Sequence, residues 1–112
     1  MSAPTWVHAP VLEPPEVYLS EWSAFVSGWP DETHPLTTHL VGYRAATGKS
    51  RTSSAVVRFD MQRRRAVTKS RKVYELVGPP NRESDARFMR IPWLVINECR
   101  YVRDATSEFF NS

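Results

Sequence analysis

The large apolar side chains of residues 15–29 recur at helical spacing. They are Tyr18, Trp22, Phe25 and Trp29, separated by four, three and four residues. Such steps place side chains on one face of an α-helix. Pro15 and Gly28 stand where helices commonly begin and end. The pattern predicts an amphipathic helix over residues 15–28 whose aromatic face packs on the rest of the fold; docking of that face into a partner's groove is the alternative.

After residue 36 the hydrophobic period changes from about 3.6 to 2. Four segments alternate between apolar and polar positions: 37–45, 53–59, 65–68 and 72–77. The linkers between them are polar and turn-like, and too short for the crossovers that parallel strands need. These segments therefore predict four antiparallel strands in a meander.

The last third predicts a second helix and a final strand. Gly78 and the two prolines after it end the meander, and Ser84 is a typical N-cap for a helix that runs toward Ile96 and that Pro92 would kink or shorten. Residues 100–104 read as a last strand. The expected fold is α+β: a four- to five-stranded antiparallel sheet (meander) with an N-terminal amphipathic helix and a shorter second helix after Asn81.

A chain of 112 residues suits one domain with one core. Four prolines lie in the first 15 positions, so we expect an extended, proline-rich arm over residues 1–14 and a single α+β domain over 15–112.

Cys99, the single cysteine, cannot form an intramolecular disulfide, and no signal-peptide pattern begins the sequence. No apolar run reaches the length of a membrane span. The expected compartment is the cytoplasm of a bacterial host.

Charge is segregated along the sequence. The first 43 residues hold five acids and no lysine or arginine, whereas the stretch from Arg44 to Lys72 holds ten of the fifteen basic residues and one acid, Asp60. Such a layout favours an acidic partner for the middle of the chain.

The recognisable chemical motifs are incomplete. Residues 46–50 read ATGKS and copy the end of a phosphate-binding loop, but Tyr43 stands where that loop needs glycine, so a hairpin loop is the interpretation. His34 and His39 are five residues apart, a step that suits neither a helical nor a strand pair of metal ligands. Cys99 paired with a histidine stays open as a nucleophile, although a small buried side chain is its usual role. We expect no catalytic residue, metal, cofactor or small-molecule substrate, and hence no enzyme.

The basic stretch supplies the candidate partner-binding residues. Its members, with two acids from the first third of the chain, are Arg44, Lys49, Arg51, Arg63, Arg64, Arg65, Lys69, Arg71, Lys72, Asp31 and Glu32. In a meander, the loops at 47–52 and 69–71 would share one end of the sheet and concentrate charge there. A solvated face that prevents edge-to-edge pairing is the alternative. Nucleic acid and an acidic protein surface are both compatible partners.

One stretch resembles a known pattern. Residues 67–80 read VTKSRKVYELVGPP, followed by Asp85-Ala86 and by Asp104-Ala105-Thr106. They resemble a pattern in small uncharacterised proteins of proteobacterial phages and integrated elements: a strand, a serine-glycine turn and a strand ending in leucine, glycine and proline, then a helix and a last strand. The resemblance covers about residues 38–106, with Arg71 where the pattern has glycine. It implies a mobile element, whose small accessory proteins often bind host machinery.

These observations lead to one functional expectation and one rival. The expectation is a non-enzymatic phage or mobile-element protein that binds and inhibits a host protein or ribonucleoprotein defence complex, in the manner of anti-CRISPR proteins, by blocking access of nucleic acid or nuclease. The rival is a nucleic-acid-binding accessory or regulatory protein of the same element.

Overall fold

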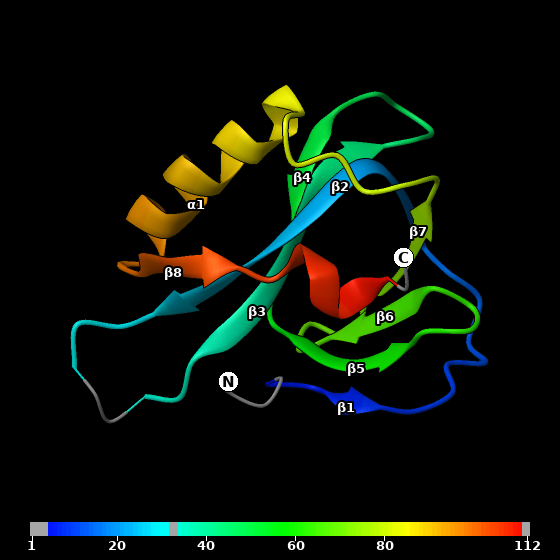
Figure 1. The fold of residues 1–112 in the computed structure, drawn as a ribbon, viewed down its shortest axis with the longest axis horizontal. Coiled ribbons are helices and arrows are strands. Elements are labelled where there is room, and N and C mark those ends of the chain that lie inside the picture. The colour runs from blue at the N-terminus through cyan, green and yellow to red at the C-terminus, as the bar shows by residue number, and fades with distance from the viewer. Residues whose placement is uncertain (1–4, 32–33, 111–112) are drawn as a thin grey trace.

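The computed structural model describes residues 5–31 and 34–110. Within them the chain forms one curled sheet with a short helix against one side (Figure 1). In chain order the elements are β1 (Val7–His8), β2 (Val17–Gly28), β3 (Thr37–Arg44), β4 (Ser50–Thr52), β5 (Val56–Asp60), β6 (Arg65–Thr68), β7 (Val73–Val77), the 3-10 helix η1 (Asp85–Met89), α1 (Arg90–Ile96), β8 (Arg100–Asp104) and the 3-10 helix η2 (Thr106–Phe109).

The sheet is mixed, so the predicted antiparallel meander is wrong. Its strand order is β1-β5-β6-β7-β2-β3-β4, and β8 pairs with the second half of β2. The short turns do make β5, β6 and β7 antiparallel neighbours. However, β2 pairs with β7 in parallel, and β1 pairs with β5 in parallel. These pairs join segments far apart in sequence, which local linker lengths cannot reveal.

The predicted N-terminal helix is also wrong, because residues 17–28 form the central strand β2. A β-bulge explains the misleading spacing. β2 carries one more residue than β3 between positions 20 and 23, and Glu21 adopts a positive φ of 48°. Leu19 joins the main core before the bulge and Trp22 joins it after the bulge, a step of three instead of two. The aromatic residues at helical spacing therefore share no face: Tyr18 is exposed, Trp22 lies in the main core, and Phe25 lies in the second hydrophobic cluster.

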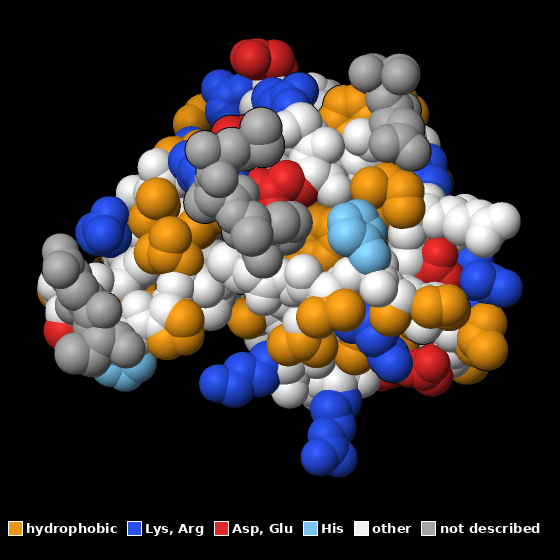
Figure 2. Space-filling model, turned by 60° about the horizontal axis from the view of Figure 1, so that its bottom comes forward, with side chains coloured by type: hydrophobic (Ala, Val, Ile, Leu, Met, Phe, Trp, Pro, Cys, Tyr) orange, Lys and Arg blue, Asp and Glu red, His pale blue; other side chains and the backbone are white. Residues whose placement is uncertain are grey.

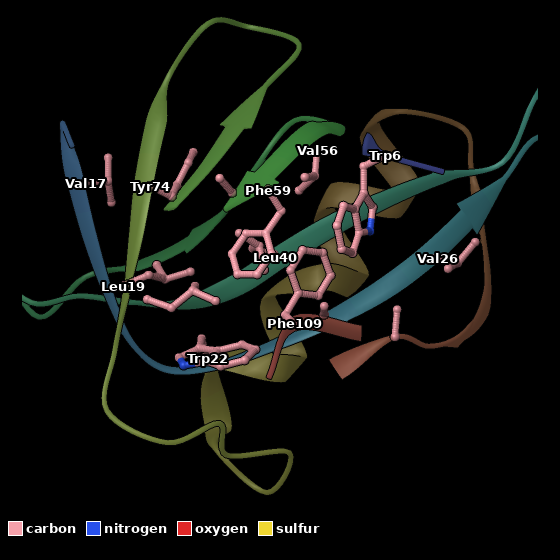
Figure 3. Close-up of a cluster of buried hydrophobic side chains, with 14 residues drawn as sticks. Trp6, Val17, Leu19, Trp22, Val26, Leu40, Val56, Phe59, Tyr74 and Phe109 are labelled. Atoms are coloured by element: carbon pink, nitrogen blue, oxygen red, sulfur yellow. The ribbon is translucent and has the colours of Figure 1, made fainter. Parts of the chain in front are cut away.

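The second half of β2 is buried on both faces. On one face Trp22 joins the main hydrophobic core, in which the rings of Trp6, Phe59 and Phe109 lie with centroids 4.9–5.5 Å apart (Figure 3). On the other face Phe25 packs with Val41 and with Leu94 of α1. Gly42 permits the tight packing of β3 on β2, because a Cβ there would lie 2.8 Å from the Ser20 carbonyl oxygen.

The helix predicted after Asn81 is present but begins as a 3-10 turn. The side chain of Ser84 accepts a hydrogen bond from the Ala86 amide, which caps η1, and α1 continues from Arg90. Pro92 lies in the first turn of α1, where its missing N–H leaves no helical hydrogen bond unmade. The predicted final strand at residues 100–104 is β8.

Both ends of the described chain contribute to the core. The proline-rich arm is extended and belongs to the sheet, since Trp6 and Val11 are buried and β1 pairs with β5. Phe109 of η2 closes the same core from the C-terminal side. Across the described ranges, no helix is both long and apolar enough to cross a bilayer.

Candidate binding surface

The basic residues of the middle stretch gather at two opposite ends of β6. The β5–β6 turn lies at one end, where Asp60 pairs with Arg65. The β6–β7 turn lies at the other, where Val67 pairs with Val73. One run of basic sequence therefore becomes two separate surfaces.

The β3–β4 hairpin lies at the same end as the β6–β7 turn. The start of β2 runs between them: Leu19 pairs with Arg44 on one side, and Val17 pairs with Tyr74 on the other. The structure thus brings the loops at 47–52 and 69–71 together as the sequence predicted, but through β2 instead of through a meander. We call this surface the basic end; it consists of Arg44, Lys49, Arg51, Lys69, Arg71 and Lys72.

Two cations of the basic end have partners within the fold. Lys72 forms an ion pair of 3.5 Å with Glu16. Arg51 donates from Nε to the Tyr74 hydroxyl at 2.9 Å, which ties β4 to β7. No ion pair to another described residue holds the remaining four, which are Arg44, Lys49, Lys69 and Arg71.

Arg71 occupies a position that favours glycine. Its φ is +70°, in the left-handed region, and its amide donates to the Thr68 carbonyl at 2.8 Å. Glycine adopts this region without steric cost, so the turn has a geometry that suits glycine while carrying an arginine. Left-handed backbone costs a residue with a Cβ about 1–2 kcal/mol. An exposed arginine at that position lowers stability without an ion pair among the described residues in return.

The arginines of the β5–β6 turn are, by contrast, internally satisfied. Arg63 pairs with Asp60 at 3.1 Å and Arg65 pairs with Glu75 at 3.0 Å. Arg64 donates to the Gly78 carbonyl, and its guanidinium lies 6.0 Å from the Trp22 ring centroid. These three side chains hold the turn onto its surroundings.

Asp60 organises that turn. Its carboxylate accepts hydrogen bonds from the amides of Val11, Gln62 and Arg63, each at 3.0 Å. The Val11 hydrogen bond is the largest cause, and Arg63 a further one, of the lowering of the Asp60 pKa to about 2, against the effect of burial. The sequence identified Asp60 as the lone acid of the basic stretch but did not reveal this role.

The segregation of charge along the sequence is not kept in space. Glu13 pairs with Arg58 at 2.7 Å, and Glu16 pairs with Lys72. Asp31 follows the far end of β2 and contacts His34 at 2.6 Å, away from the basic end. Glu32 lies outside the described residues. In the face seen in Figure 2, Lys and Arg side chains are interspersed with Asp and Glu side chains and with apolar and neutral surface.

The ATGKS segment is a hairpin loop, as predicted. Gly48 adopts a φ of +71°, and its amide donates to the Arg44 carbonyl at 2.7 Å. A strand, β4, follows it, so no helix N-terminus is aimed at a phosphate.

The candidate nucleophile and metal ligands do not assemble. The Cys99 thiol donates to the Asn97 carbonyl at 3.3 Å, and burial raises its pKa. His39 is buried, whereas His34 is exposed. Among the described residues, no group of three or more metal-ligating side chains is present.

His39 belongs to a buried polar network that the sequence did not indicate. Its Nε2 lies 3.0 Å from Ser27 Oγ and 2.8 Å from Thr37 Oγ1, and its Nδ1 lies 3.0 Å from the Ser53 carbonyl oxygen. Burial lowers the His39 pKa to about 4. A serine beside a histidine is a feature of hydrolases, but here the carbonyl replaces the orienting carboxylate and Ser27 is fully buried. The arrangement serves packing between the sheet and Trp93, whose ring centroid is 4.2 Å from that of His39.

A pocket of about 560 Å³ opens near the β5–β6 turn, beside Arg64, Pro79 and Phe110. Its lining is mainly apolar. The basic end and this pocket are separate features, because the pocket lies at the end of β7 where Gly78 follows the strand.

No protein-family model, curated protein or solved structure matches this chain.

Proposed function

We propose that this protein is a non-catalytic binding protein of a mobile element that uses its basic end to dock on, and inhibit, a host defence complex. The observation that carries the proposal is a set of four cations at two neighbouring loops that form no ion pair with another described residue: Arg44, Lys49, Lys69 and Arg71. Every other basic residue between positions 44 and 72 has an acid, a hydroxyl or a carbonyl partner in the fold.

Arg71 supports the proposal because its backbone is left-handed, a conformation that glycine would adopt with less conformational strain. Residues held in sparsely populated backbone regions cluster at functional sites. A partner that contacts the Arg71 side chain would compensate the conformational cost.

An acidic protein surface fits the basic end better than a bare polyanion. Glu16 lies within the basic end beside Lys72, and its side chain is half exposed. A mixed-charge protein surface can complement such a carboxylate, whereas a phosphate backbone would be repelled by it.

The mechanism is steric occlusion without turnover. Basic loops steer the protein toward an acidic patch on the complex, and the bound domain then covers a nucleic-acid path or the docking site of a nuclease. Such an inhibitor needs affinity and bulk, and no catalytic group.

Affinity capture from a nuclease-treated host lysate tests the proposal. The wild-type protein should retain a stoichiometric defence or nuclease complex. Arg71→Gly combined with Lys69→Gln should reduce capture at least about tenfold, because each removes a cation of the contact. Glu98→Gly is the matched control: it relieves a similar positive φ of 56° without touching the basic end, and should capture normally. Equal capture by all three proteins would contradict the assignment of the surface.

One observation favours nucleic acid as a second candidate partner. Glu13 and Glu16 are paired with Arg58 and Lys72, so the acidic first third repels a polyanion less than its sequence suggests. In that case affinity for DNA or RNA should fall log-linearly with salt, with a slope of about 0.9 per phosphate neutralised on duplex DNA. A gel shift at about 150 mM salt that shows no complex at micromolar protein would remove this candidate.

A further inference from the structure

The helical segment after Asn81 is apolar on nearly every side. One side of α1 packs on the sheet through Leu94 and Trp93. The opposite side carries side chains that are 42–79% exposed: Phe88, Met89, Ile91, Val95 and Ile96. We call these five residues the apolar face. A helix that is hydrophobic on all sides is usually buried on all sides. Here the sheet covers one side of the helical segment, and the apolar face is left exposed to solvent.

The apolar face forms one stripe. Phe88 lies near the end of the 3-10 helix η1, and positions 91 and 95 of α1 follow it at steps of three and four, with 96 beside 95. The five side chains expose roughly 500 Å², near the upper end of the largest patch on an ordinary monomer. The apolar face shares no residue with the basic end. Its C-terminal part lies by the far end of β2, where β8 brings residue 100 beside Gly28, while η1 contacts β3 and β4.

We infer that the apolar face is a two-fold interface between two copies of this chain, with the α1 helices antiparallel. The exposed area of the apolar face matches what a dimer needs. A standard interface buries about 800 Å² of each partner, and about 65% of a homodimer interface is apolar. Each copy must therefore contribute roughly 520 Å² of apolar surface. The apolar face supplies that amount.

The charges at the two ends of the stripe are self-complementary. Asp85 and Arg87 precede the stripe, and Glu98 and Arg100 follow it. In an antiparallel pair centred on Pro92, Phe88 faces Ile96 of the second copy. Asp85 then lies near Arg100 of the second copy, whereas Arg87 is held by Glu83 of its own chain at 3.2 Å. A two-fold axis makes each contact twice, which is the self-complementarity that an isologous interface requires. A parallel arrangement would bring like charges together.

Sedimentation velocity between about 1 and 100 µM measures the inference directly. The wild-type protein should change from a species of 12.9 kDa to one of twice that mass as concentration rises. Val95→Glu should raise the dissociation constant of the dimer at least about tenfold, because it places a charge in the centre of the contact. The variant should stay folded, since Val95 is 71% exposed. Leu12→Glu is the matched control: Leu12 is 69% exposed but lies outside the apolar face, and this variant should dimerise normally.

A charge exchange tests the antiparallel arrangement. Asp85→Lys and Arg100→Glu should each weaken the dimer about threefold or more, and the double variant should recover most of the loss. A monomer at every concentration, which would leave the surface to a different partner, overturns the inference. So does a dimer that Val95→Glu does not weaken. Double-variant behaviour that is merely additive would overturn the antiparallel arrangement.

Discussion

Two turns rich in basic residues flank β6, and they differ in what their charges do. In the β5–β6 turn, Arg63 and Arg65 pair with Asp60 and Glu75, and Arg64 caps a carbonyl. In the β6–β7 turn, Lys69 and Arg71 have no such partner among the described residues. The same residue type therefore serves the fold at one end and remains available to a ligand at the other. The density of charge along the sequence does not distinguish a stabilising cation from an available one. The acidic residues that lie nearby in space make that distinction.

The largest effect is expected from a substitution at the centre of the β5–β6 turn. Asp60→Ala leaves three backbone amides without their acceptor, including the buried amide of Val11. We expect a loss of about 3 kcal/mol or more in the free energy of unfolding, since an unsatisfied buried donor alone costs about 1–3 kcal/mol. Urea denaturation measures it. A loss under about 1 kcal/mol would mean that the turn does not depend on its carboxylate.

Acid should weaken the fold in two stages. The pKa of His39 in the fold, about 4, lies below its usual value of 6.5, so its contribution is complete above pH 6.5 and is lost as pH falls to 4. The Asp60 pKa of about 2 lies below 3.8, so its contribution is lost between about pH 4 and pH 2. We expect losses of roughly 3 and roughly 2 kcal/mol respectively. Stability curves against pH check this, with Asp60→Asn expected to remove the second stage alone.

A glycine substitution sharpens the comparison, because Arg64 and Arg71 both adopt positive φ. Arg71→Gly should stabilise the protein by about 0.5–1 kcal/mol, the relief of left-handed strain less the added chain entropy of glycine. Arg64→Gly gains the same relief but loses the bond to Gly78 and the contact with Trp22, so it should destabilise by about 1 kcal/mol. Thermal denaturation compares the pair. Shifts of the same sign would show that the two arginines are equivalent for folding.

The smallest effect is expected at the tips of the basic end. Lys49→Gln and Lys69→Gln should each change the free energy of unfolding by less than about 0.5 kcal/mol, because both side chains are exposed and lack an ion pair among the described residues. Urea denaturation beside Arg65→Gln, which removes the pair with Glu75, provides the contrast. A clear loss at either lysine would reveal a structural role.

The strands with short turns were predictable from the sequence, and β2 was not. Segments 65–68 and 100–104 read as short strands in the sequence, and both are strands at those positions. In β2 the bulge at Glu21 shifts the alternation, and burial on both faces removes the polar positions that mark a strand. Its parallel partner β7 lies more than 40 residues away, beyond the reach of a local pattern.

The candidate surface was predictable as a composition but not as a geometry. The sequence identified the cations and the shared end of two loops. The sequence could not show which of these cations form ion pairs within the fold. Arg65 and Arg71 are the same residue type, and only the folded structure places Glu75 beside Arg65. The buried network around His39 gave no signal, since serine and threonine are common in exposed strands as well.

The most direct test of the basic end is lysine footprinting, because all three lysines of the chain, Lys49, Lys69 and Lys72, belong to it. Acetylation rates of the free protein and of the protein in its captured complex are compared by mass spectrometry, with an arginine-selective reagent reporting Arg63 in parallel. The account predicts that Lys49 and Lys69 become strongly protected in the complex while Arg63 reacts as before. Lysines that stay as reactive as in the free protein while Arg63 becomes shielded, or a lysate that yields no complex, would contradict it.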